Sequence, residues 1–131
     1  MNNMRNKTKG EIEAEISEAI TKFKIENIGK GPKEVKSYII EDMVVIRLKG
    51  ALTTSEQQLT KSPEGIALVK RSRVCLLEKA KSVLENLLHS LLNVDIVSFY
   101  VDVNPKIAEM FIVLGLSKDV EANFQVDKNS T

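Results

Sequence analysis

The segment Gly29-Lys30-Gly31-Pro32 combines residue types that could bind an anion. Glycine lacks a Cβ atom, so backbone amides can approach a ligand closely, and the Lys30 ammonium would lie beside them. A Walker-type nucleotide loop, however, needs Ser or Thr after Gly-Lys and then a helix whose first amides meet the phosphate. Here proline and a strand-like segment follow, which excludes the Walker pattern, and the glycine spacing excludes the Rossmann pattern. The alternative is a plain helix cap and turn, since glycine often ends helices.

Three further cations could join Lys30 in such a site. Arg73 lies on the apolar stripe of a predicted helix, between Val69 and Leu76. An arginine there either extends to solvent or meets a buried acceptor, and its planar guanidinium suits a carboxylate, phosphate or bicarbonate. The hypothetical anion site comprises Lys30, Arg47, Lys70 and Arg73. Glu56 and Asp102 could instead form structural ion pairs with these cations, so both interpretations stay open.

No combination of residues in the sequence predicts catalysis or a metal centre. His89 is the single histidine and belongs to no zinc pattern, and the single cysteine, Cys75, excludes an internal disulfide framework. A serine elbow, a glycosidase-like carboxylate pair and an HExxH motif are also missing from the sequence. We therefore expect no catalytic residues and no metal ligands, and the identity of any cofactor stays unknown. The sequence favours a role other than that of an enzyme.

The composition predicts one soluble globular domain. Hydrophobic residues make up 43% of the 131 residues and charged residues 28%. The net charge of +1 hides a gradient, because residues 28–81 carry 11 basic and 6 acidic side chains, whereas residues 82–131 carry 3 basic and 7 acidic ones. This excess is too mild for a dedicated nucleic-acid binder, so we expect no nucleic-acid partner. We also expect a cytoplasmic protein without a transmembrane segment, since the sequence shows neither a signal peptide nor a long apolar segment.

Hydrophobic periodicity predicts three helical and four strand segments in the order α-β-β-α-α-β-β. The predicted helices span residues 8–27, 53–59 and 66–92, and the predicted strands span residues 35–40, 43–48, 94–103 and 110–116. Two hairpins around a long central helix indicate an α+β fold, namely a two-layer sandwich with a four-stranded antiparallel sheet. We expect a single domain over residues 8–117, with residues 1–7 and 118–131 as flexible tails.

The segment from Met110 to Leu116 is apolar at successive positions, so it would be apolar on both faces of a strand. Such a strand is either central in its sheet or covered by a partner. Together with the apolar stripe of the first predicted helix, this pattern predicts a homodimer.

One combination of motifs resembles a known family. Its parts are Gly29-Lys30-Gly31-Pro32-Lys33-Glu34-Val35, Val45-Ile46-Arg47-Leu48-Lys49-Gly50, Leu52-Thr53, Glu56, Gly65, Leu68-Val69-Lys70 and Arg73. Together they are similar to the MpsC-like family of small bacterial proteins, formerly a domain of unknown function, and the resemblance runs from about Glu11 to Leu116. Asp102 stands where family members also tend to carry an acid. The family offers no established catalytic residues to transfer to this sequence.

The resemblance implies a place in a membrane system. The family name refers to a sodium-translocating, membrane-potential-generating system whose membrane subunits are tied to inorganic-carbon uptake. The chain would then be an accessory or regulatory component of a membrane ion or bicarbonate translocating system. It would act by protein–protein contact and by small-anion binding, peripheral to the membrane through a transport subunit. The alternative function is a stand-alone protein that binds a nucleotide or another anionic ligand.

Overall fold

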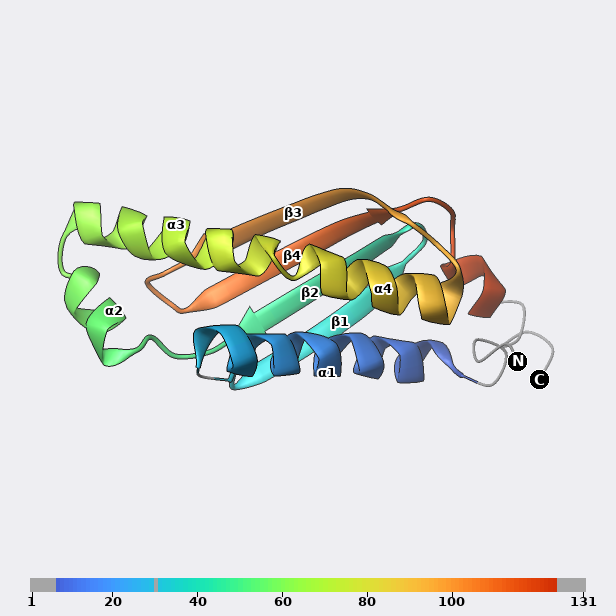
Figure 1. Ribbon diagram of the computed structural model, residues 1–131, viewed down its shortest axis with the longest axis horizontal. Helices are drawn as coiled ribbons and strands as arrows, with labels where there is room; N and C mark the ends of the chain where they lie inside the picture. The colour runs from blue at the N-terminus through green and yellow to red at the C-terminus, as the bar shows by residue number, and fades with distance from the viewer. Residues whose placement is uncertain (1–6, 30, 125–131) are drawn as a thin grey trace.

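The computed structural model describes residues 7–29 and 31–124 and confirms the predicted α+β fold (Figure 1). Its elements are α1 (Lys9–Ile28), β1 (Glu34–Ile40), β2 (Met43–Lys49), α2 (Thr54–Leu59), α3 (Pro63–Glu78), α4 (Lys81–Leu92), β3 (Ile96–Asn104) and β4 (Glu109–Leu116). The long predicted helix is present as α3 and α4, which together form one bent helix. The two-layer arrangement is also as predicted, because α1, α3 and α4 all lie on one face of the sheet.

The sheet has the strand order β1-β2-β4-β3, and all its pairs are antiparallel. Each outer pair is a hairpin, and the turn residues Glu41 and Ala108 have φ values of 54° and 51°. The central pair, β2 with β4, joins the two hairpins along a seam from Met43 opposite Gly115 to Lys49 opposite Glu109. Residues from distant parts of the chain therefore lie side by side at the middle of the sheet.

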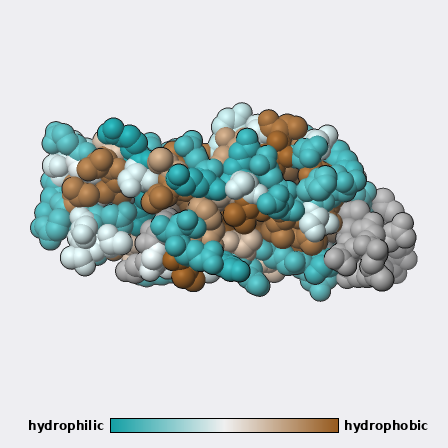
Figure 2. All heavy atoms as spheres, in the orientation of Figure 1, coloured by the Kyte–Doolittle hydropathy of each residue, from teal (hydrophilic) through white to brown (hydrophobic). Residues whose placement is uncertain are grey.

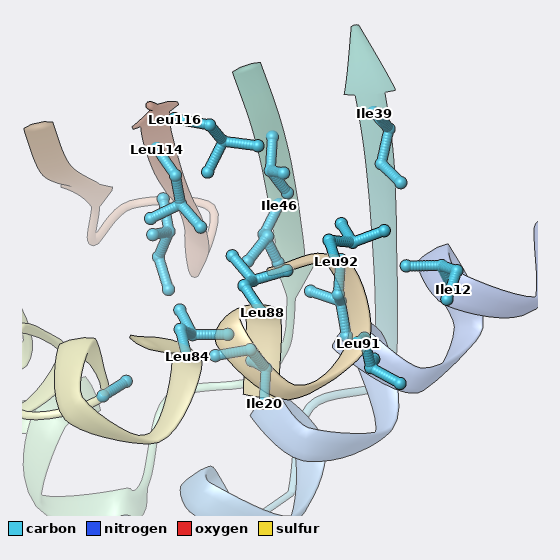
Figure 3. Packing of buried hydrophobic residues seen from close by; sticks show 14 of the residues in the cluster. Ile12, Ile20, Ile39, Ile46, Leu84, Leu88, Leu91, Leu92, Leu114 and Leu116 are labelled. Atoms are coloured by element: carbon cyan, nitrogen blue, oxygen red, sulfur yellow. The ribbon is translucent and has the colours of Figure 1, made fainter. Parts of the chain in front are cut away.

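The core lies between the sheet and the helices. Alternate residues of each strand face the helices, because successive side chains of a strand point to opposite faces. Figure 3 shows Ile46 of β2 and Leu114 of β4 directed toward Leu84 and Leu88 of α4, and all four side chains are fully buried. Isoleucine and leucine dominate this cluster, as expected from a sequence that contains few aromatic residues.

Helix α1 is bounded by sequence-encoded caps. Thr8 and Glu11 form a reciprocal capping box at its start, and Gly29 ends it in the left-handed conformation with φ 85°. Gly29 donates its N–H to the carbonyl of Ile25 at 3.1 Å. Gly29, the first glycine of the Gly29-Lys30-Gly31-Pro32 segment, is thus the C-terminal cap of α1. Lys30 itself lies outside the described residues.

Helix α1 also covers the outer edge of β1. The Glu13 carboxylate accepts the backbone N–H of Ile39 at 2.7 Å, and the hydroxyls of Ser17 and Ser37 hydrogen-bond at 2.7 Å. The contact with Glu13 occupies a backbone donor of the strand edge that would otherwise be available to another chain.

The bend between α3 and α4 occurs at Lys79 and Ala80, and no glycine or proline is present there. The N–H groups of these two residues donate to carbonyls only three positions earlier, those of Leu76 and Leu77, at 3.1 and 2.9 Å. This tightened turn changes the direction of the helix. The two halves can then both direct buried residues toward the twisted sheet.

Residues 118–124 differ from the expected flexible tail. Val120 and Phe124 are buried in the core cluster, and the Glu121 carboxylate bonds Lys9 of α1 at 2.6 Å and the backbone N–H of Glu41 at 2.8 Å. Val120 and Phe124 stand among mostly polar residues in the sequence, too few to show a hydrophobic period. They are buried because this segment lies beside the turn between β1 and β2, where the N–H of Val120 donates to the carbonyl of Glu41. The expected tails at residues 1–6 and 125–131 lie outside the described residues.

Candidate functional site

Arg73 forms a buried ion pair with Glu56 where α2 meets α3. Its side chain is only 2% exposed. The guanidinium binds the carboxylate in a bidentate manner, with Nε donating to Oε2 at 2.7 Å and Nη2 donating to Oε1 at 2.6 Å. Nη2 also donates to the carbonyl of Ala51 at 3.2 Å, and Nη1 contacts the sulfur of Met110 at 3.6 Å. Every nitrogen of this guanidinium therefore has a partner from the protein.

Glu56 is held in place by the start of α2. Thr53 caps this helix, with its hydroxyl accepting the Glu56 N–H at 3.1 Å and its own N–H donating to Glu56 Oε1 at 2.9 Å. Hydrogen bonds from Arg73 are the largest cause that lowers the pKa of Glu56, from 4.5 to about 2, against the opposing effect of burial. A single carboxylate thus serves both as the third residue of a capping box and as the anion that neutralises Arg73.

This pair predicts a pH dependence of stability. Because the pKa of Glu56 is lower in the folded chain, its stabilising contribution is fully present above about pH 4.5 and is lost as the pH falls toward 2. Glu56→Gln should lower the free energy of unfolding at pH 7 by about 1.5–3 kcal/mol. It should also make the decline between pH 4.5 and 2 less steep.

Urea denaturation across this pH range measures both effects. The control is Glu85→Gln, which removes an exposed carboxyl from α4 and should leave the pH profile almost parallel to that of the wild type. Identical acid profiles for Glu56→Gln and the wild type would contradict the role given to this ion pair.

Arg47 and Arg73 lie on opposite faces of the sheet. In the β2–β4 register, Arg47 is opposite Phe111, whereas the next residues, Leu48 and Met110, face the helices. Arg73 contacts Met110 on the helical side. Arg47 is on the other side, where its Nε and Nη2 donate to Glu109 Oε2 at 2.9 and 2.6 Å and its guanidinium lies 5.7 Å from the centre of the Phe111 ring. The fold does not bring these two arginines together.

Lys70 and Asp102 form a third ion pair, at the edge of β3 and apart from the pairs of Arg73 and Arg47. Their charged atoms are 3.3 Å apart, and both side chains are largely exposed. The pKa of Asp102 is lowered mainly by the hydrogen bond that its carboxylate accepts from the N–H of Val103, and to a smaller extent by the nearby Lys70 ammonium. Among the described residues of the hypothetical anion site, Arg47, Lys70 and Arg73 therefore enter three separate ion pairs, and Lys30 lies outside the described residues. Glu109 is a partner that the sequence did not indicate.

The second candidate region is the face of the sheet opposite the helices, which we term the open face. No helix in the described part of the chain covers it. Its central row crosses all four strands as Tyr38, Val45, Val113 and Tyr100. Tyr38 is 44% and Tyr100 is 64% exposed, while the two valines are half-buried. Ile40 and Met43 extend this apolar surface, and both are exposed.

A row that contains three charged residues borders the central row. It crosses the sheet as Lys36, Arg47, Phe111 and Asp102. Figure 2 shows the helical side of the molecule, where hydrophilic residues and apolar patches lie side by side. None of the helices in the described residues is long and apolar enough to cross a membrane. The open face thus combines exposed aromatic and aliphatic side chains with charges of both signs, as protein–protein contact surfaces do.

Comparisons with known proteins agree with the resemblance seen in the sequence. Residues 8–118 match the family described as "Na+-translocating membrane potential-generating system (MpsC)". The uncharacterized protein YbcI of Bacillus subtilis (strain 168) is 34% identical over 119 residues, which cover 91% of this chain and 96% of the relative. The uncharacterized protein YrhF of the same strain is 36% identical over 64 residues, which cover 49% of this chain and 52% of that relative. No solved structure gives a significant match. With almost its whole described length matched, the chain belongs to the MpsC family.

Proposed function

We propose that this protein is an accessory or regulatory component of a membrane ion or bicarbonate translocating system and that it acts by binding other protein chains. The observation that carries the proposal is the family match, because the family description names a sodium-translocating system that generates membrane potential. An accessory component needs a surface that other chains can contact. The open face is of this kind, since large exposed apolar patches are uncommon on proteins that act alone.

Protein binding is a better supported mode of action than anion binding. The donors of Arg73 are already used by Glu56, Ala51 and Met110, and Arg47 is on the opposite face of the sheet. A ligand would have to displace a bidentate carboxylate from a buried guanidinium, which costs several kcal/mol. The stand-alone nucleotide or anion binder therefore gains no support from the arrangement of these residues.

The proposal is tested by deleting the gene for this chain in the organism that carries it. Membrane potential is then measured with a voltage-sensitive dye over a range of external sodium concentrations. We expect a smaller potential at high sodium in the deletion strain and recovery when the chain is supplied from a plasmid, with the empty plasmid as the control. A deletion strain whose potential matches that of the wild type at every sodium concentration contradicts the proposal.

A further inference from the structure

We propose that the open face binds a second copy of this chain, about a two-fold axis that runs parallel to the strands between the two sheets. The inference does not depend on the role in ion translocation, and it names a second copy of this chain as the chain that contacts the open face, so a transport subunit would contact another surface of the dimer. It identifies the occupant of the open face from the placement of charges on that face.

The strand register fixes where each outward residue would lie in such a dimer. A two-fold axis parallel to the strands reverses the strand order but keeps positions along the strands. It therefore places β1 over the partner's β3 and β2 over the partner's β4. Lys36, Arg47, Phe111 and Asp102 form one row across the sheet, so the corresponding row of the partner lies over them.

This superposition brings together groups of complementary chemistry. Lys36 meets the partner's Asp102, and Arg47 meets the partner's Phe111, whose ring face attracts a guanidinium. In the central row Val45 meets the partner's Val113, and Tyr38 meets the partner's Tyr100. In the row of Lys49 and Glu109, Lys49 meets the partner's Glu109. In these three rows the apolar residues of the central row face apolar residues, and each lysine faces a carboxylate. In the fourth row Ile40 meets the partner's Ser98, and Met43 meets the partner's Gly115.

The other in-plane axis gives a poor match. An axis across the strands at the middle of the face would place β1 over the partner's β1, and the charged row over the partner's central row. Lys36 would then lie against the partner's Tyr38, and Arg47 against the partner's Val45. Lys36 would then have no carboxylate from the partner, and Arg47 would face an aliphatic side chain in place of an aromatic ring, and both changes are unfavourable. The charge pattern therefore favours the axis parallel to the strands.

The usual tilt between packed sheets preserves these contacts. Aligned sheets cross at about 30°. At the edge strands, which are about 7 Å from the centre, this tilt shifts facing residues by roughly 4 Å, or about one residue along a strand. Lysine side chains are long and flexible enough to span such a shift.

The pairing of Lys36 with Asp102 can form only between two chains. These residues lie on β1 and β3, the two edge strands of the sheet, with β2 and β4 between them. Three strand spacings separate them by about 14 Å within one chain. Within one chain Lys36 pairs with Glu34 and Asp102 pairs with Lys70, so recovery of the dimer on mixing the two charge variants, rather than the effect of either variant alone, reports on the contact between chains.

The experiment uses sedimentation velocity on the full-length chain at about 10–100 µM. We expect the wild type to sediment as a dimer of the 14.6 kDa chain. Lys36→Asp and Asp102→Lys, each alone, create two like-charge contacts per dimer and should raise the dissociation constant at least about tenfold. An equimolar mixture of these two variants should form a heterodimer, because the introduced acid of one variant faces the introduced lysine of the other at one contact, and the native Asp102 faces the native Lys36 at the second contact. The double variant should also recover the dimer.

A second pair of variants tests the apolar row. Val113→Asp places a charge at the centre of the open face and should give a monomer, whereas Val83→Asp, on α4 and 39% exposed, should leave the dimer intact. Circular dichroism confirms that each variant is folded. The proposal is overturned if the wild type is a monomer at 100 µM, if Val113→Asp remains dimeric, or if the mixed charge variants form no heterodimer. The last result, combined with a monomeric Val113→Asp, would assign the open face to a dimer with another axis.

Discussion

Arg73→Met is expected to lower the free energy of unfolding by about 3–5 kcal/mol at neutral pH, because it breaks a buried ion pair from one side. The methionine would fill much of the space of the arginine stem, but Glu56, whose side chain is 17% exposed, would retain a negative charge without its bidentate partner. The carbonyl of Ala51 would also lose a donor. Urea denaturation at pH 7 and a fixed protein concentration measures the change.

Two further variants distinguish the effect of breaking the ion pair from the effect of removing any arginine from α3. Arg71→Met, at an exposed position of the same helix, should change stability by less than about 0.5 kcal/mol. Arg73→Met combined with Glu56→Gln should recover part of the loss, because a neutral amide needs no cation and can still accept the N–H of Thr53. A single Arg73→Met variant that loses less than about 1 kcal/mol would show that the pair contributes little.

Gly65→Ala is expected to cost at least about 3 kcal/mol, because there is no room for a Cβ atom where α3 begins against α2. The added carbon would lie 1.6 Å from the carbonyl oxygen of Leu59 and 2.5 Å from its carbonyl carbon. Helix α2 would have to move away from α3, and this movement would also separate Glu56 from Arg73. Thermal and urea unfolding should both report the loss.

Gly10→Ala is the matched control for this substitution. It also lies in the first turn of a helix, but the nearest atom to its added Cβ is the hydroxyl of Thr8 at 4.0 Å. The better helix propensity of alanine should leave stability unchanged or raise it by up to about 1 kcal/mol. Similar stabilities for Gly65→Ala and the wild type would mean that the contact between α2 and α3 is not tight.

Local chemistry made much of the fold predictable. Gly29 and Pro32 indicated the end of α1, and alternating apolar residues indicated the hairpins. The three-residue spacing of Thr53 and Glu56 is that of the capping box that begins α2. The bend at Lys79 and Ala80 was not predictable, because these residues are compatible with a straight helix. The bend lets α3 and α4 both pack against the twisted sheet, and this packing depends on the whole fold and not on the residues at the bend.

The candidate site was harder to predict, because it depends on which face each residue occupies. The periodicity placed Arg73 on an apolar stripe, which in the structure lies on the helical side of the sheet, whereas Arg47 lies on the open face. The ion pair of Glu109 with Arg47 could not be predicted, because it depends on the register between β2 and β4, which no local pattern encodes. The same unknown register concealed the continuous row formed by Tyr38, Val45, Val113 and Tyr100.

The seam between β2 and β4 has a consequence for how the chain is made on the ribosome. The first hairpin is complete at Lys49, but its partner strand β4 begins only at Glu109. At about 5–20 residues per second, synthesis of the roughly 60 residues between them takes about 3–12 s. Throughout this interval β2 has an unpaired edge and an apolar face, while α1, already synthesised, can shield the edge of β1. The nascent chain is therefore most vulnerable to aggregation along the strand that later becomes the centre of its sheet.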